Sequence, residues 1–470
     1  MTTQPGVSPW TAEYRSLSLG IVALVSVFGF EGIAVGTVMP VVARDLDSLA
    51  HYTVGFTAFS MASIAGMAFA GVWVDRVNLY RVVVVTMATL AVGSLTIGCA
   101  NTLQVFVAGR VMQGFGLGID LVTMYVIVGR AYPESVRPKA LGMLAGAWVI
   151  PGLLGPALAG AMVQVWSWRA IFLVIPVVLV LPLTFLLPRL RELPAATTSE
   201  HASGQKKIFA VGLLIIGLTL LQSISGHAGK WSWLNVSLGI GVSLFIIALS
   251  TRWLMPSGYL VARRGLPAVI ALRGLVAASY FSAEVFIPLA LQNRGVSVGL
   301  SGMILGAACV MWFAGSSFQG STRVKWARST FLAVGFAVLI VATLLLPVAV
   351  LATNSAGSAA LASASVWACA AFGVGLIYPT LGVLLLEKSE SYAADSASLQ
   401  MSDSMGVIIG TSLVGALLTA ASVGGSPDSA TFSRIWLLTA LFGGVALAIS
   451  GRVQNTLSKD NLKVANLTGE

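Results

Sequence analysis

Apolar residues are gathered along this chain in long runs that short polar segments separate. A helix needs about 20 mainly apolar residues to cross the hydrocarbon core of a bilayer. Fourteen runs meet that length, so the pattern predicts fourteen membrane-spanning helices. They cover residues 17–42, 53–74, 82–99, 104–128, 140–163, 170–187, 208–226, 233–252, 268–290, 298–319, 329–351, 360–386, 396–421 and 433–451.

The composition points to the same class of protein. Apolar residues make up 57% of the 470 residues, charged residues only 9%, and the mean hydropathy is +0.91. In an ordinary soluble domain about a quarter of the residues are charged. A soluble fold of this composition would lack the polar surface that keeps a protein in water. Globular cytosolic enzymes, secreted domains and disordered chains are therefore excluded, and the chain is expected to be an all-α polytopic membrane protein.

The net charge of +10 has a membrane explanation. With both termini inside, the predicted cytoplasmic segments hold 20 of the 27 Lys and Arg residues, and the outer segments hold five. Such a bias sets the orientation of membrane proteins, so both termini are predicted to be cytoplasmic and the first helix to be an uncleaved anchor in the cell membrane. No basic run is interleaved with aromatic residues, which argues against nucleic-acid binding.

The order of the runs suggests two similar halves. We expect an N-terminal six-helix half at 1–187, a cytoplasmic linker at 188–207 and an accessory helix pair with its loop at 208–267. A C-terminal six-helix half at 268–451 and a cytoplasmic tail at 452–470 follow. Residues 155–161 (GPALAGA) align with residues 410–416 (GTSLVGA) in the fifth helix of each half. Duplicated halves are typical of secondary transporters, and the absence of a GxxxxGK[ST] loop from the sequence argues against ATP-driven pumping.

Four local patterns occur in order on the first five predicted helices. The first helix contains Phe30-Glu31 and ends in the segment 39–46 (MPVVARDL). The loop between the second and third helices contains Asp75-Arg76 and then Arg81. The fourth helix contains the segment 110–116 (RVMQGFG), and the fifth contains 151–160 (PGLLGPALAG).

Together these patterns resemble the major facilitator superfamily, and especially its 14-helix drug:proton antiporter branch. The resemblance implies two six-helix bundles plus a two-helix central insertion, and export driven by protons. It also implies that Arg110 takes part in proton coupling and that Gly152, Gly155, Pro156 and Gly160 form the exporter motif of helix five. Two departures stand out: residues 78–80 (NLY) replace the family's Gly-Arg-Arg, and helix five has two rather than three residues before Gly155-Pro156.

The ionisable residues inside predicted spans are the first candidates for function, because charge in hydrocarbon is costly. We expect Glu31 to carry the proton or contact the substrate, Glu284 and Asp120 to follow it, and Arg110 to tune them. Arg273 is expected to extend to the membrane interface, and Asp403 to belong to the polar start of its helix. Satisfied interhelical hydrogen bonds are the structural alternative for each.

Further residues are assigned to gating and to the cavity. Asp75, Arg76 and Arg81 form a candidate gating loop, and the glycines of helix five allow close packing while Pro156 can kink it. Lipid-facing or packed rings are the alternative reading of the aromatic candidates. The candidate cavity-lining residues are Gln113, Tyr125, Trp148, Tyr280, Phe281, Trp312 and Tyr378.

The sequence thus predicts a monomeric, proton-coupled exporter of lipophilic, cationic small molecules. The three cysteines and three histidines have no metal-ligand spacing, so neither a metal nor an organic cofactor is expected, and the proton gradient is the energy source. A lipid exporter or flippase and a proton-coupled nutrient importer keep the same fold. An intramembrane enzyme or a sensor is disfavoured, because no histidine lies mid-span and no soluble output domain is present.

Overall fold

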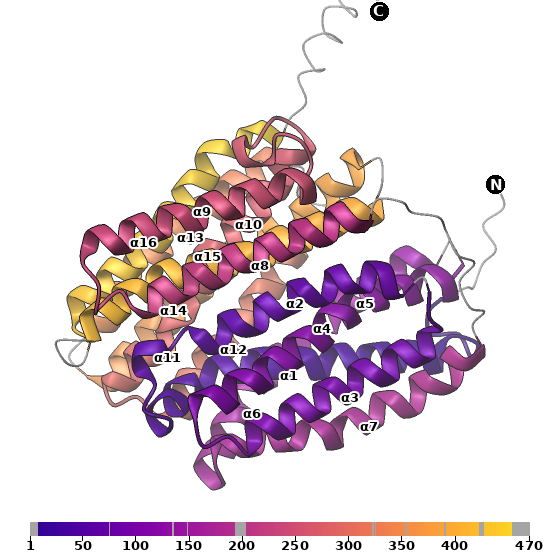
Figure 1. Ribbon diagram of the computed structural model, residues 1–470, viewed down its shortest axis with the longest axis horizontal. Helices are drawn as coiled ribbons and strands as arrows, with labels where there is room; N and C mark the ends of the chain where they lie inside the picture. The colour runs from indigo at the N-terminus through magenta and orange to yellow at the C-terminus, as the bar shows by residue number, and fades with distance from the viewer. Residues whose placement is uncertain are drawn as a thin grey trace, which may run out of the picture.

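The structure is a computed structural model that describes residues 8–74, 76–133, 136–147, 149–192, 204–321, 324, 326–352, 355–389, 392–422 and 427–453. Every regular element within these ranges is a helix (Figure 1). The fold class therefore agrees with the prediction of an all-α protein.

The N-terminal half consists of seven α-helices and one short 3₁₀ turn. They are α1 (Arg15–Asp45), η1 (Leu49–His51), α2 (Val54–Trp73), α3 (Leu79–Gly98), α4 (Leu103–Ala131), α5 (Arg137–Gly146), α6 (Val149–Val165) and α7 (Trp168–Glu192). The accessory pair follows as α8 (Gly204–Gly226) and α9 (Trp233–Leu254), with η2 (Tyr259–Val261) after it.

The C-terminal half has the same number of α-helices. They are α10 (Leu266–Glu284), α11 (Phe286–Asn293), α12 (Val298–Gln319), α13 (Arg328–Leu351), α14 (Ala356–Lys388), α15 (Tyr392–Ser422) and α16 (Ser429–Ile449), and η3 (Ser450–Val453) ends the described chain.

Polar residues mark where several of these helices begin. The side chains of Thr102, Ser297 and Asp428 accept hydrogen bonds from backbone N–H groups in the first turns of α4, α12 and α16. These N–H groups have no partner inside the helix, so a short polar side chain just before an apolar run fixes its start. The sequence therefore predicts where these three helices begin.

Two spans that the apolar pattern predicts as continuous are each broken into two helices. The run 140–163 divides between α5 and α6, and the run 268–290 divides between α10 and α11. In both cases the break lies about one turn before a proline, at Ala147 before Pro151 and at Val285 before Pro288. Proline has no N–H to donate to the carbonyl four residues earlier and its ring clashes there. The span predicted at 268–290 is nevertheless kept, because Leu266–Asn293 as a whole is long and apolar enough to cross a membrane.

The number of spans is close to the prediction. Twelve helices are long and apolar enough to cross a membrane, and two shorter apolar helices, Val54–Ala70 and Leu154–Val165, lie where the second and fifth spans are predicted. The count of fourteen stays a prediction, because these two helices are short.

The two halves repeat one packing pattern. Helix α2 packs on α4 as α12 packs on α14, and α1 packs on α7 as α10 packs on α16. Likewise α3 packs on α7 and α13 on α16. The indigo-to-purple and the orange-to-yellow helices form two separate bundles in Figure 1. The halves meet along two seams, one between α6 and α12 and the other between α2 and α15.

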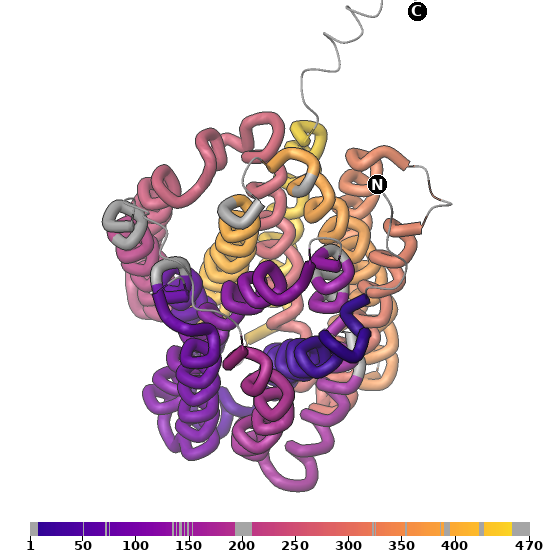
Figure 2. The backbone as a smooth tube through the Cα atoms, turned by 90° about the vertical axis from the view of Figure 1, so that its right-hand side faces the viewer, coloured from indigo at the N-terminus to yellow at the C-terminus, as the bar shows by residue number. Residues whose placement is uncertain are grey.

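We name the two ends of the bundle by the segments they carry. The linker side holds the start of α1, the end of α7 and the turn between α9 and α10, and it faces the viewer in Figure 2. The opposite side holds the turns between α1 and α2, α6 and α7, and α11 and α12. The charge bias predicts that the linker side is cytoplasmic. Most of the predicted linker (193–203) and of the tail (454–470) lies outside the described residues.

Candidate functional site

A buried ion pair joins the first and fourth spans. Arg110 on α4 donates a hydrogen bond from Nη1 to Oε1 of Glu31 on α1, and each side chain is only 3% exposed. Both residues were candidates because of their depth in an apolar run, but they are 79 residues apart in the chain. The fold brings them together, so each charge has its counter-ion within the membrane domain.

A polar network surrounds Arg110. Its Nη1 also donates to Oε1 of Gln113 at 2.9 Å, and its Nε donates to the carbonyl of Gly55 at 3.0 Å. Gln113 in turn donates from Nε2 to Ser94 Oγ at 2.8 Å, and the guanidinium lies 4.1 Å from the centre of the Phe59 ring. The guanidinium is thus held from four directions. Gln113, a candidate for cavity lining, is fully buried in this network.

Asp120 lies deeper along α4 and has a smaller set of contacts. Its Oδ1 accepts a hydrogen bond from Thr86 Oγ1 at 2.6 Å, while Oδ2 is buried without a partner among the described residues. Ten residues separate it from Arg110, about 15 Å along the helix, so the two do not form one site. A buried carboxyl oxygen without a partner is costly, which marks Asp120 as functional or strained.

Four of the aromatic cavity candidates form one cluster in the C-terminal half. The ring of Trp312 on α12 lies 5.5 Å from Tyr280, 6.2 Å from Phe281 and 4.8 Å from Tyr378 on α14. Trp367, which the sequence did not single out, stacks on Tyr280 with centroids 4.6 Å apart. Tyr280 and Trp367 are buried, whereas Phe281, Trp312 and Tyr378 are partly exposed. We call these five residues the aromatic cluster.

Glu284 adds a carboxyl group to the edge of the aromatic cluster. The indole N–H of Trp367 donates to Glu284 Oε1 at 3.5 Å, and Glu284 is close enough to Cys309 and Tyr378 to interact with both electrostatically. No ion pair to Glu284 is found among the charged side chains that the structure describes. The cluster therefore presents one carboxyl group without a resident cation beside several π faces.

Arg273 and Asp403 form a second ion pair, which the sequence reading missed. Arg273 Nε donates to Asp403 Oδ1 at 2.7 Å, and the hydroxyl of Tyr378 donates to the same oxygen at 2.9 Å. The guanidinium lies 3.6 Å from the centre of the Tyr378 ring. Arg273 was expected at the membrane interface and Asp403 at a helix start. Both expectations were wrong, because α15 begins at Tyr392 and the two side chains are only 14% and 22% exposed.

Tyr125 faces this second pair from the other half. It lies on α4, is 43% exposed and interacts electrostatically with Arg273 on α10. Its exposure excludes a position in the packed core, and cavity lining stays a prediction for Tyr125. Tyr125 and Arg273 therefore approach each other from the two halves.

Glycines of the exporter motif bring α6 against α12 on the opposite side. A Cβ atom added at Gly160 would lie 2.4 Å from Gly299 Cα, and one added at Gly302 would lie 2.9 Å from the carbonyl oxygen of Pro156. Gly152 faces Cys309 at 2.9 Å in the same way, while Gly155 is in ordinary contact with Phe30 and Ile33 of α1. Small residues in these positions let the two halves touch through their backbones.

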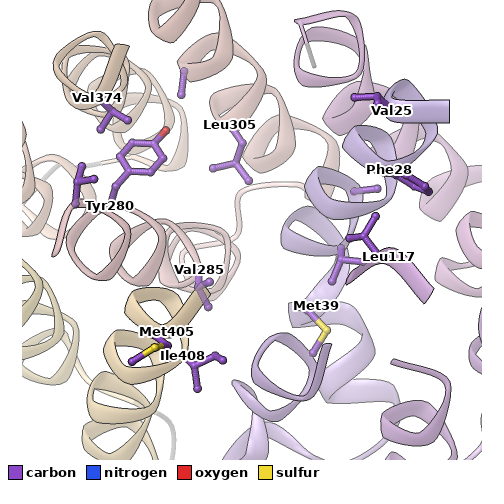
Figure 3. Packing of buried hydrophobic residues seen from close by; sticks show 14 of the residues in the cluster. Val25, Phe28, Met39, Leu117, Tyr280, Val285, Leu305, Val374, Met405 and Ile408 are labelled. Atoms are coloured by element: carbon purple, nitrogen blue, oxygen red, sulfur yellow. The ribbon is translucent and has the colours of Figure 1, made fainter. Parts of the chain in front are cut away.

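Two glycines of α1 show where this helix meets the C-terminal half. A Cβ atom added at Gly36 on α1 would contact Leu305 of α12 at 3.8 Å, whereas one added at Gly32, one turn nearer the linker side, would meet nothing within 4 Å. Leu305 lies between Tyr280 and the helix that carries Phe28 and Met39 (Figure 3). Helix α1 thus touches α12 at Gly36, and at Gly32 its surface has no such neighbour.

Hydrogen bonds close the opposite side as well. Tyr52 donates from its hydroxyl to the carbonyl of Val285 at 2.8 Å, and Arg44 donates to Asn293 Oδ1 at 2.9 Å. Each bond joins an N-terminal residue to a C-terminal one. With the glycine contacts, they describe a conformation that is closed on the opposite side.

The remaining candidates take no part in the contacts described above. Asp75 and Trp148 are outside the described residues, and Arg76 and Arg81 are exposed on the linker side. Within the described ranges, no group of three or more His, Cys, Asp or Glu side chains could hold a metal ion.

Known proteins resemble the chain over most of its length. The profile of the Major Facilitator Superfamily matches residues 19–411. The chain is 25% identical to the multidrug transporter protein MdtP of Bacillus subtilis (strain 168), over 86% of this chain and 75% of that protein. It is 20% identical to the multidrug efflux pump SdrM of Staphylococcus aureus (strain N315), over 70% and 74% of the two chains. A crystal structure of a POT family transporter in complex with a thioalcohol-conjugated peptide has the same fold, with a TM-score of 0.68 at 13% identity over 94% of this chain and 96% of that one.

Proposed function

The chain belongs to the Major Facilitator Superfamily, and from this premise we propose that it exports lipophilic, cationic small molecules in exchange for protons. It is a polytopic membrane transporter. The single observation that carries the finer proposal is the combination of a buried, ion-paired carboxylate in one half with an unpaired carboxyl group beside aromatic rings in the other. The name of the relative SdrM, a multidrug efflux pump, supports export, and the name of MdtP, a multidrug transporter, supports the class of substrate.

Glu31 is proposed as the proton carrier of the N-terminal half. As a carboxylate it forms the ion pair with Arg110, and removing either charge from such a buried pair leaves the other uncompensated. Protonation of Glu31 therefore weakens the bond between α1 and α4. Arg110 keeps its bonds to Gln113 and to the Gly55 carbonyl in either case, so the proton changes the contact with α1 selectively. A proton bound at Glu31 is thereby converted into a change in helix packing.

The aromatic cluster and Glu284 are proposed as the substrate site. The π face of Trp312 attracts cations, most strongly when water is excluded, whereas the Tyr378 ring already carries the Arg273 guanidinium. The rings of the cluster also offer apolar surface to a lipophilic body. Glu284 supplies a negative charge at the edge of the cluster when it is ionised. The site therefore favours an organic cation over an anion, which agrees with the class of substrate that the sequence predicts.

The two carboxyl groups lie on corresponding helices of the two halves. Glu31 is on α1 and Glu284 on α10, and these helices take equivalent places in the repeated packing pattern. A cation held by ionised Glu284 is released when that group takes up a proton, so substrate and proton compete for the same negative charge. Competition of this kind is sufficient for exchange transport. The cation occupies the site during one half of the conformational cycle and the proton during the other half, so the two cross the membrane in opposite directions.

The direction of transport is proposed from the charge bias. If the linker side is cytoplasmic, as the distribution of Lys and Arg predicts, the conformation described here is closed to the outside, as loading of an exported compound from the cytoplasm requires. We propose the cell membrane as the location and the monomer as the working unit, since all proposed site residues belong to one chain.

Transport by the purified protein in liposomes tests this proposal. An acidic interior is imposed on liposomes that contain the protein, and a lipophilic fluorescent cation and a fluorescent lipid are followed in parallel. We expect gradient-dependent movement of the cation that an ionophore abolishes and that Glu284→Gln reduces at least tenfold. Lipid movement without a gradient would replace the proposal with a flippase. Movement of the cation in the same direction as the protons, out of the acidic interior, would replace the proposal with an importer.

A further inference from the structure

Helix α8 of the accessory pair lies in a seam between the two halves. It contacts both α2 of the N-terminal half and α15 of the C-terminal half, and Figure 1 shows it running along them. Near the opposite side, a Cβ atom at Gly226 would lie 3.2 Å from the ring of His51, and farther along α8 Thr219 Oγ1 is 3.6 Å from Met61 Sδ. The first helix of the accessory pair therefore follows one of the lines along which the halves meet.

One buried amide on α8 is bonded to both halves at once. Gln222 is 8% exposed and donates from Nε2 to Thr53 Oγ1 at 3.2 Å. Its Oε1 accepts a hydrogen bond from Ser412 Oγ at 2.7 Å. Thr53 precedes α2 and Ser412 lies on α15, so the donor end of the amide is committed to the N-terminal half and its acceptor end to the C-terminal half.

The residues around this amide are closely packed across the seam. A Cβ atom added at Gly415 on α15 would lie 2.7 Å from Thr53 Oγ1, so the absence of a side chain at Gly415 lets the threonine approach α15. The junction lies on the opposite side, level with the Tyr52–Val285 hydrogen bond that also joins the halves. Gln222 is therefore placed where the halves must separate when the opposite side opens.

We propose that Gln222 is a clasp between the halves, through which α8 stabilises the conformation closed on the opposite side. When Thr53 and Ser412 move apart, the amide can follow only one of them. Its hydrogen bond to the other residue is then lost. A buried polar group without a partner costs free energy until water reaches it. Gln222 is thus a positioning residue that sets how often the opposite side opens. The inference requires only that the halves move relative to each other, and it does not depend on the substrate or on protons.

Spin-label distances across the opposite side test the clasp. Labels at Gln104→Cys on α4 and Ala430→Cys on α16 occupy exposed positions in different halves on that side. They are introduced in a background in which Cys99, Cys309 and Cys369 are replaced by alanine. In Gln222→Met, which keeps the length of the side chain but cannot bridge the hydroxyls, the ratio of long to short distances should rise about fivefold, as loss of one net hydrogen bond predicts. Ser223→Ala, at an exposed neighbouring position on α8, is the matched control and should leave the ratio unchanged.

A second variant keeps the test valid if Gln222→Met folds poorly. Ser412→Ala removes one hydroxyl and the bond that it donates, with little change in volume, and should shift the distances in the same direction. The double variant Gln222→Met/Ser412→Ala should shift them no further than Gln222→Met alone, because both changes break the same bond. Distance distributions that match the Ser223→Ala control in both single variants would overturn the proposal. Fully additive shifts in the double variant would overturn it too.

Discussion

The Glu31 carboxylate on α1 and the Arg110 guanidinium on α4 are bonded to each other at a depth where each side chain is 3% exposed. Loss of one member of a buried ion pair destabilises a protein by about 3 to 5 kcal/mol, whereas loss of both is far better tolerated. We therefore expect Arg110→Gln alone to lower the melting temperature in detergent more than the double variant Glu31→Gln/Arg110→Gln does. A double variant that loses as much stability as the two single variants Glu31→Gln and Arg110→Gln together would mean that the pair has no energetic coupling.

The aromatic cluster leads to a prediction about substrate affinity. Trp312→Leu removes a π face that is within 5.5 Å of Tyr280 and 4.8 Å of Tyr378, and it should weaken binding of a lipophilic cation about tenfold, within the range of a desolvated cation–π contact. A neutral compound of the same shape should bind almost as well as before. Tryptophan fluorescence quenching by each compound measures both affinities. A loss of equal size for the neutral compound would assign Trp312 to apolar packing.

Tyr378 combines two roles that conservative variants can separate. Tyr378→Phe keeps the ring over the Arg273 guanidinium but removes the hydrogen bond to Asp403, whereas Tyr378→Leu removes both. We expect Tyr378→Phe to lose about 1 kcal/mol of stability, the net value of one hydrogen bond, and Tyr378→Leu to lose clearly more. Denaturation in detergent compares the three proteins. Identical losses would show that the ring over Arg273 contributes nothing.

The close contact at Gly160 predicts that a bulky side chain at this position opens the seam between α6 and α12 on the opposite side. Gly160→Leu places a side chain where a Cβ atom already lies 2.4 Å from Gly299 Cα, so it should prevent closure on the opposite side. Labelling of a cysteine at Thr37, which is buried on α1 beside Gly302, should then accelerate from that side, while transport falls. Gly212→Leu is the matched control, because a Cβ atom at Gly212 meets nothing within 4 Å. Equal labelling of both variants would contradict the role of α6 in closure.

His51 gives the contact between α8 and the N-terminal half a pH dependence. Burial and, after it, the charges of His227 and Lys230 hold the pKa of His51 below its ordinary value of 6.5. The folded protein therefore binds the proton less readily than the unfolded chain, so its stability falls as the pH drops below about 6.5. His51→Gln should lose less stability than the wild type between pH 7 and pH 5. A melting temperature that falls by the same amount in both proteins between pH 7 and pH 5 would contradict this assignment.

The apolar pattern predicted nearly all of the helices, because the bilayer requires about 20 apolar residues per span. It missed the breaks at Ala147 and Val285, which come before Pro151 and Pro288. Both prolines were visible in the sequence, but Pro156, Pro182 and Pro347 lie inside unbroken helices, so a proline alone would not have placed the breaks.

The candidate site was predictable by residue type but not by pairing. Glu31 and Arg110 stood out because charge is rare in apolar runs, yet only the packing of α1 on the N-terminal bundle makes them partners. Arg273 and Asp403 were set aside because each lies near a predicted helix end. Their 130-residue separation hides the bond between them. Trp367 gave no signal, since tryptophans in spans more often face lipid or packed neighbours.

The central claim is that protonation of Glu31 couples proton movement to export, and proton flux measures it most directly. Liposomes that contain the protein and a trapped pH indicator are given a lipophilic cation at zero initial gradient. We expect cation movement to drive protons in the opposite direction in the wild type, and Glu31→Gln to carry the cation without proton movement or not at all. Proton countermovement of wild-type size in Glu31→Gln would contradict the account.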